Sequence, residues 1–184
     1  MTSTARYGPV AQAFHWTTAV LVLVAFIYGP GGSEEHVYSD GVDTDRRIHE
    51  TLGLCVFALV ALRLPWRLYD THPDRPSVSR WMGIASKALQ WTLYALLFAV
   101  PMTAIGGAWL GGHPVTLLSD VTIEPWLGRS HDAGAKMATV HKWLGDILLW
   151  LAGLHALAAL YHRFVLKDGL LASMLPAWPG TGRD

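Results

Sequence analysis

Four apolar stretches of this 184-residue chain constrain its fold more than any other feature. They cover residues of about 10–28, 48–68, 84–110 and 140–166, and each is long enough to cross a bilayer as a helix, which takes about 20 residues. Only 15% of the residues are charged, whereas a soluble domain carries about 25%. We therefore predict an all-α fold with one domain, residues 1–184, built as an integral membrane four-helix bundle embedded in lipid.

Turn-forming residues separate the four spans. Gly and Pro cluster at residues 29–32, 72–76 and 111–114, as expected for loops. Pro101 falls inside the third span, where it should kink the helix or split off a re-entrant end.

Two classes of protein are excluded by charge and cysteine usage. The formal net charge is zero, so no nucleic-acid partner is expected. Cys55 is the single cysteine of the chain, which rules out an internal disulfide framework.

Lysine and arginine orient the bundle. Nine of them fall on one side of the predicted membrane and five on the other, and the larger number marks the cytoplasm. Both termini are then cytoplasmic. The cytoplasmic set is Arg6, Arg63, Arg67, Arg75, Arg80, Lys87, Arg163, Lys167 and Arg183, and the opposite set is Arg46, Arg47, Arg129, Lys136 and Lys142.

Nine histidines are unusual in so apolar a chain. Five have ordinary explanations, since four lie in loops and one near the inner end of the last span: His36, His72, His113, His131 and His162. The other four lie within or at the edge of a span, where an ionisable group is costly and usually functional. They are His15, His49, His141 and His155. For a single membrane histidine, a hydrogen bond to a neighbouring helix is an equally good explanation.

The spacing of these four histidines predicts two pairs. His141 and His155 are 14 residues apart, which returns to nearly the same helix face about 21 Å further along. Because the first span starts inside, His15 lies at the level of His155 or a turn shallower. Depth alone would also let His15 pair with His162, seven residues after His155; we prefer His155, because it keeps both sites inside the hydrocarbon. Because the second span starts outside, His49 lies at the level of His141.

Two imidazoles that face each other inside a bundle are the axial ligands of a low-spin haem, so we predict two haems. His49 and His141 each begin the pattern H-x-x-L-G, in which Gly53 or Gly145 lies at i+4 on the face of the histidine and leaves room for a flat macrocycle. Close helix packing is the alternative explanation for the glycines. Zinc needs four ligands in one tetrahedron, whereas these pairs are far apart. The chain has no C-x-x-C-H motif, so the haems are non-covalent, b-type.

Four segments resemble the bacterial cytochrome b561 family: RYGPVAQAFHW at 6–16, RIHETLG at 47–53, VHKWLGD at 140–146 and GLHALAALYH at 153–162. The resemblance covers essentially the whole chain. It implies a di-haem protein of the bacterial inner membrane, in which His15 and His155 hold the cytoplasmic-side haem and His49 and His141 the periplasmic-side haem. It also implies oxidation of superoxide at the periplasmic face and reduction of ubiquinone.

Each haem carries two propionates, which need cationic partners near the membrane surface. Arg63 and Arg67 are candidates on the inner side, and His162 is a further propionate partner. On the outer side a basic collar flanks the ligands: Arg46, Arg47, Lys136 and Lys142. This collar either binds propionates or steers a small anion such as superoxide to the haem edge.

Three functions therefore remain open. The first is an oxidoreductase that takes electrons from superoxide or another small reductant to ubiquinone. The second is a di-haem membrane-anchor subunit that passes electrons between quinone and a redox partner protein, such as a periplasmic dehydrogenase or hydrogenase. The third is a histidine-lined proton or metal transporter without haem.

Overall fold

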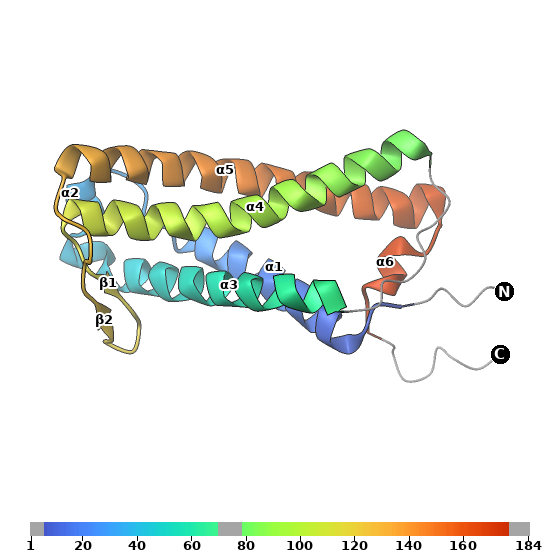
Figure 1. The fold of residues 1–184 in the computed structure, drawn as a ribbon, viewed down its shortest axis with the longest axis horizontal. Coiled ribbons are helices and arrows are strands. Elements are labelled where there is room, and N and C mark those ends of the chain that lie inside the picture. Colours follow the sequence, from blue (N-terminus) through green and yellow to red (C-terminus); the bar gives the residue numbers. More distant parts are fainter. Residues whose placement is uncertain (1–5, 70–78, 177–184) are drawn as a thin grey trace.

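Four long helices dominate the computed structural model, which describes residues 6–69 and 79–176. They are α1 (Pro9–Ile27), α3 (Asp43–Tyr69), α4 (Arg80–Gly111) and α5 (His131–Tyr161), and they run along the length of the molecule (Figure 1). Each is long and apolar enough to cross a membrane. The predicted all-α, four-span fold is therefore confirmed.

Two of the helices begin at least five residues before the apolar stretch that predicted them. α3 starts at Asp43 and α5 at His131, five and nine residues before the predicted spans at 48 and 140. Acidic residues occupy the first turn of both helices, Asp43 and Asp45 in α3 and Asp132 in α5, where they stabilise the positive end of the helix dipole. Hydropathy alone detects the lipid-facing part of a helix and misses these polar first turns.

Of the two outcomes predicted at Pro101, a kink or a re-entrant end, the structure excludes the re-entrant end. α4 continues through Pro101 to Gly111, although its axis changes direction part-way along (Figure 1). The hydroxyl of Thr103 donates to the carbonyl oxygens of Ala99 and Val100 at 2.9 and 2.8 Å. The missing amide of Pro101 leaves a different carbonyl, that of Leu97, without its helical donor. The Thr103 bonds add hydrogen bonding in the turn that contains the proline.

The largest helix contacts form two pairs, α4 with α5 and α1 with α3. Glycines allow the first pair to approach closely: a Cβ added to Gly134 would lie 2.6 Å from the backbone nitrogen of Gly111. α3 also joins the two pairs. Its Val56 and Val60 form a small buried cluster with Tyr94 of α4, and Leu21 and Val22 of α1 pack against this cluster.

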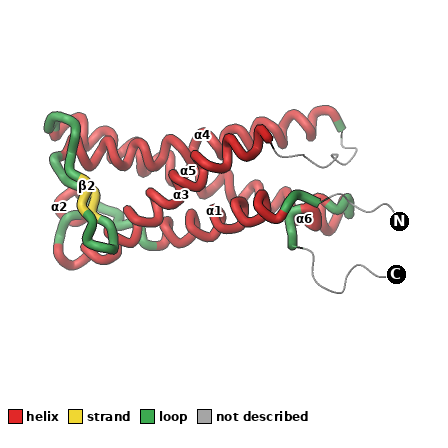
Figure 2. The backbone as a smooth tube through the Cα atoms, turned by 60° about the horizontal axis from the view of Figure 1, so that its bottom comes forward, coloured by secondary structure: helices red, strands yellow, loops and turns green. Residues whose placement is uncertain are grey.

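One end of the bundle, here called the hairpin end, carries short elements that the sequence analysis missed. These are α2 (Glu34–Val37), the 3-10 helix η1 (Asp40–Val42), and the strands β1 (Val115–Thr116) and β2 (Thr122–Ile123). The strands are antiparallel, with Val115 opposite Ile123. β1 is fixed to α3, because the Glu50 carboxylate accepts from the Thr116 amide at 2.6 Å. Figure 2 shows the strands beside α2 at this end.

The opposite end, here called the α6 end, is closed by the π-helix η2 (His162–Leu166) and by α6 (Leu170–Ser173). Figure 1 shows α6 beside the start of α1. The amide of Tyr7 donates to the Ser173 carbonyl at 3.0 Å, and the Trp16 indole donates to that of Met174 at 2.8 Å. The predicted loop at 72–76, with His72 and Arg75, and Arg183 lie outside the described residues.

Candidate haem sites

The structure brings His15 of α1 and His155 of α5 together near the α6 end. Their ring centroids are 6.2 Å apart and their planes cross at 74°. Both side chains are half-buried. These are the two residues that helical spacing assigned to one level of the membrane.

A second pair lies nearer the hairpin end, between His49 of α3 and His141 of α5. The ring centroids are 5.9 Å apart and the planes cross at 85°. α5 therefore supplies one imidazole to each pair, while α1 and α3 supply the partners.

Both separations suit an ion held between two imidazoles. An imidazole nitrogen lies about 2 Å from a first-row metal that it ligates, so the centres of two rings on opposite sides of one metal are about 6 Å apart. No group of three or more His, Cys, Asp or Glu that could hold a metal occurs within residues 6–69 and 79–176. Two-ligand sites suit haem iron, whose other ligands come from the macrocycle.

Hydrogen bonds fix the orientation of the pair nearer the hairpin end. Nδ1 of His49 lies 2.6 Å from the carbonyl oxygen of Ala25, and Nδ1 of His141 lies 2.9 Å from that of Val100. Because a carbonyl can only accept, each Nδ1 must donate, and each Nε2 is left free to ligate. A metal-binding histidine usually donates its second ring nitrogen in this way.

The end of α1 explains why the Ala25 carbonyl is available. The last four carbonyls of a helix have no intrahelical partner, and the amide of Gly29 bonds to Phe26 instead. A Cβ on Gly29 would lie 3.4 Å from the His49 ring, so this turn passes close to the imidazole.

Space is open beside Gly53 and Gly145, one turn along the helix from His49 and His141. Apart from the adjoining residues and the nearby backbone of the same helix, no heavy atom of the described residues lies within 4 Å of a Cβ added to either glycine. In contrast to Gly134, these two glycines are not required by helix packing. The open space fits the prediction that a flat macrocycle lies there.

Arg63 and Arg67 of α3 lie at the α6-end pair. The Arg63 guanidinium is 3.4 Å from Nδ1 of His15, and both guanidiniums stack on Tyr94, at 5.3 and 5.2 Å from its centroid. Among the described residues, neither arginine forms an ion pair with a carboxylate. A cation within a membrane segment is costly without an anion, so two haem propionates fit this place.

At the hairpin end, three of the four residues of the basic collar are already paired with carboxylates. Arg46 binds Asp43 and Glu50, Arg47 binds Asp43 and Asp120, and Lys136 binds Asp132. Lys142 is exposed and forms no ion pair with a described residue. These contacts neutralise most of the charge with which the collar would attract an anion.

His162, a predicted propionate partner, binds a carboxylate instead. Its Nδ1 donates to Oδ2 of Asp168 at 2.5 Å, and the two side chains are 17% and 15% exposed. Sequence analysis missed Asp168, because it follows the last span in a polar turn. The spacing of six residues carries no helical signal, since η2 ends in a left-handed residue, Lys167 (φ 52°).

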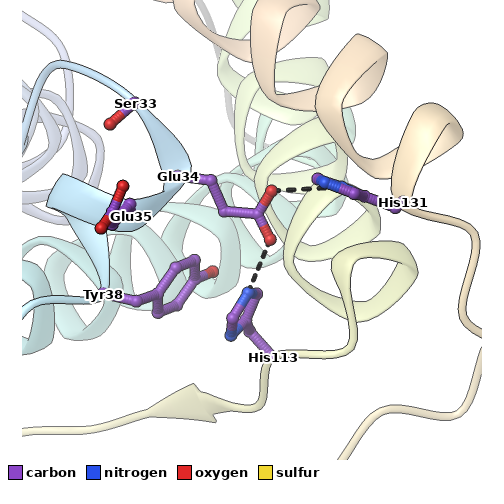
Figure 3. Close-up of a pocket in the computed structure, with 6 residues that line it drawn as sticks. All are labelled: Ser33, Glu34, Glu35, Tyr38, His113 and His131. Carbon is purple, nitrogen blue, oxygen red and sulfur yellow. Dashed lines mark hydrogen bonds and ion pairs between the residues drawn. The ribbon is translucent and has the colours of Figure 1, made fainter.

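The hairpin end also contains a cavity of about 520 Å³ that sequence analysis did not anticipate. Figure 3 shows Glu34 between two histidines: its carboxylate lies 2.8 Å from Nε2 of His113 and 3.3 Å from Nδ1 of His131. Tyr38 stacks on His113 with centroids 3.6 Å apart. Burial, with the nearby Glu50 carboxylate, raises the pKa of Tyr38 to about 12. Both histidines were expected to be solvated loop residues. His131 is largely exposed, as expected, but it is the first residue of α5, whereas His113 is half-buried. Through Glu34 they link α2 to the end of α4 and the start of α5.

Comparison with known proteins gives consistent matches over nearly the whole chain. The sequence model of the family described as prokaryotic cytochrome b561 matches residues 6–177. Cytochrome b561 homolog 2 of Escherichia coli is 29% identical, over 92% of this chain and 91% of that protein. The probable superoxide oxidase CybB of Yersinia pestis is 27% identical over 93% and 96%, and cytochrome b562 of Cereibacter sphaeroides is 27% identical over 95% and 98%.

Proposed function

The chain belongs to the prokaryotic cytochrome b561 family, and we propose that it carries electrons between two b-type haems, from superoxide on one side of the membrane to ubiquinone. Membership makes it a multi-pass b-type cytochrome of the bacterial inner membrane with a role in electron transfer. The number of haems, their ligands, the donor and the acceptor are our proposals.

The observation that carries the proposal is the presence of two imidazole pairs whose ring centroids lie about 6 Å apart. His15 and His155 would hold one haem, and His49 and His141 the other. The two ligands on α5, His141 and His155, are 14 residues apart, about 21 Å along the helix axis. Each leaflet of the membrane would therefore receive one site. We place the α6 end, where the described part of the chain begins and ends, on the cytoplasmic side, and treat residues 1–184 as one domain.

When bound, a b-type haem supplies one-electron iron redox chemistry. The histidines of this chain orient it, because the Nδ1 bonds of His49 and His141 to backbone carbonyls hold both rings in place. With two histidines at each site, the iron would have no position left for oxygen, so electron transfer through the edge of the group would be favoured. Arg63 and Arg67 would neutralise the propionates of the haem nearer the α6 end.

The proposed donor and acceptor rest on similarity and on chemistry. Superoxide is suggested by the name of the Yersinia pestis relative. An electron that enters on one face and leaves from another needs a mobile carrier, and ubiquinone is the membrane-soluble carrier that the family resemblance implies.

A direct test is spectroscopic. The purified protein should contain two haems per chain by pyridine haemochrome, with a six-coordinate low-spin spectrum. Superoxide should reduce the haems, and added short-chain ubiquinone should reoxidise them. One haem per chain, or a high-spin spectrum, would contradict the paired-ligand proposal, and a colourless protein would instead support a transporter.

The ion pairs of the basic collar favour a second candidate function, the membrane-anchor subunit. Arg46, Arg47 and Lys136 are neutralised by carboxylates, so a free anion gains little steering from them, whereas a docked protein donor needs none. If superoxide is steered, its rate of haem reduction should fall as salt screens the field over about 8–10 Å, and Lys142→Gln should flatten that dependence. A salt-independent rate, with a redox protein that co-purifies, would favour the anchor.

A further inference from the structure

His162 and Asp168 form a dyad at the α6 end that the proposed electron path does not use. Nδ1 of His162 donates to Oδ2 of Asp168, while Oδ1 of Asp168 accepts from the Leu170 amide at 3.0 Å. The carboxylate is thus held from two sides and fixes the orientation of the imidazole. Nε2 of His162 forms no hydrogen bond with a described residue, so it is the ring atom able to take up and release a proton.

The dyad lies close to the pair formed by His15 and His155. His162 follows His155 by seven residues, about 10 Å along the helix and almost on the same face. α6 packs against η2 and is tied to α1 through the side chain of Gln12, which donates to the Ser173 carbonyl at 3.3 Å. The dyad therefore lies where the chain crosses from α5 back to the helix that carries His15.

A role in binding a propionate does not suit this geometry. Asp168 places a negative charge within 2.5 Å of the imidazole, and a second anion on the same ring would be repelled by it. Arg63 and Arg67, which have no carboxylate partner among the described residues, are better placed for that purpose. The short bond resembles the histidine–carboxylate pairs that move protons in catalysis, where the carboxylate sets the tautomer and stabilises the imidazolium.

We propose that the quinone is reduced at the α6 end, that His162 protonates it there, and that Asp168 positions the His162 imidazole; this inference rests on the proposed function. Reduction of one quinone to quinol consumes two electrons and two protons. The electrons come one at a time from two superoxide anions, each of which is oxidised to dioxygen. Nε2 of His162 gives a proton to a quinone oxygen and is reloaded from water, once for each electron.

The other charged groups nearby leave this assignment intact. α6, the further element packed on η2, has no titratable side chain in Leu170–Ser173. On η2 and just after it, Arg163 and Lys167 are exposed cations, and the ring of Tyr161 lies edge-on to His162 with centroids 6.4 Å apart. The N-terminal segment adds Arg6 and Tyr7. Asp168 is therefore the acidic group in contact with the imidazole among the described residues.

The test uses the haem-loaded protein in lipid nanodiscs, reduced beforehand and mixed in stopped flow with a short-chain ubiquinone. The variants are His162→Gln and Asp168→Asn, and His36→Gln, an exposed histidine at the hairpin end, is the matched control. We expect His162→Gln to slow haem reoxidation about 100-fold, the usual effect of losing a general acid. It should also weaken the dependence of the rate on pH, because the group that donates the proton is lost. Asp168→Asn should slow reoxidation less and displace the pH profile.

Reduction of the haems by superoxide, haem content and midpoint potentials should remain at wild-type values in all three variants. If His162→Gln instead shifts the potential of the haem nearer the α6 end and leaves the rate and pH profile of reoxidation unchanged, His162 serves a propionate and the inference is overturned. If ubiquinone fails to reoxidise the wild-type protein, the proposed acceptor is wrong and the inference falls with it. Reoxidation of the wild-type haems by ubiquinone therefore distinguishes a wrong acceptor from a wrong role for His162.

Discussion

Replacing Gly145 by leucine tests whether the open space beside His141 is occupied by a haem. No heavy atom of the described residues lies within 4 Å of a Cβ at this position. The protein itself therefore imposes no overpacking cost, and leucine in place of a helical glycine should stabilise α5 by about 0.8–1 kcal/mol. On contacts within the protein alone, the variant should be at least as stable as the wild type.

The haem-loaded protein should behave in the opposite way. If the macrocycle edge lies over Gly145, a leucine side chain competes for its place, and overpacking of this kind costs about 1–3 kcal/mol. At 1.4 kcal/mol per factor of ten, this weakens haem binding by about 5- to 150-fold. Purified Gly145→Leu should then approach one haem per chain, with the site of His15 and His155 still filled.

The assay combines pyridine haemochrome stoichiometry with an optical redox titration that resolves the two haems. Gly153→Leu is the matched control, because Gly153 lies on the same helix and also has no heavy atom of the described residues within 4 Å of an added Cβ. It has a leucine, Leu149, rather than a histidine four residues earlier, so the control should keep both haems. Two haems with an unchanged titration in Gly145→Leu would refute the assignment of this space to a macrocycle.

Single ligand replacements should separate the sites. His49→Ala should lose one haem and His155→Ala the other, because the two pairs share no ligand. Loss of both haems from either variant in the haemochrome assay would contradict this. Gly134→Ala should destabilise the bundle by about 1–3 kcal/mol, since its Cβ would lie 2.6 Å from the Gly111 backbone nitrogen. Thermal unfolding should show this loss, with Gly31→Ala, whose Cβ meets no described atom within 4 Å, as an unaffected control. Tyr38, whose pKa is raised from 10.0 to about 12, contributes stability that is complete below pH 10 and is lost as the pH rises toward 12. Tyr38→Phe should remove that alkaline loss in thermal unfolding, and an equally steep loss in the variant would assign it to another group.

Much of the architecture follows from the sequence alone. The four spans could be predicted because a helix that crosses the lipid requires about 20 consecutive apolar residues. This requirement concerns one continuous segment of the chain and can be recognised without knowing the rest of the fold. Helical rise and the alternating direction of successive spans also place His49 at the depth of His141 and His15 near that of His155, although depth alone would let His15 pair with His162. In the structure the paired rings lie 6.2 and 5.9 Å apart.

The tertiary structure decided the partners of the polar groups. Glu34 meets His113 across 79 positions of the chain, Arg47 meets Asp120 across 73, and the partner of His162 lies beyond a left-handed turn. Such contacts depend on the paths of loops between the helices, and no helical period or hydropathy rule describes those paths. Whether a cation is free to bind an anion or already neutralised is therefore a property of the folded chain, while the depth of a histidine in the membrane is already a property of its sequence.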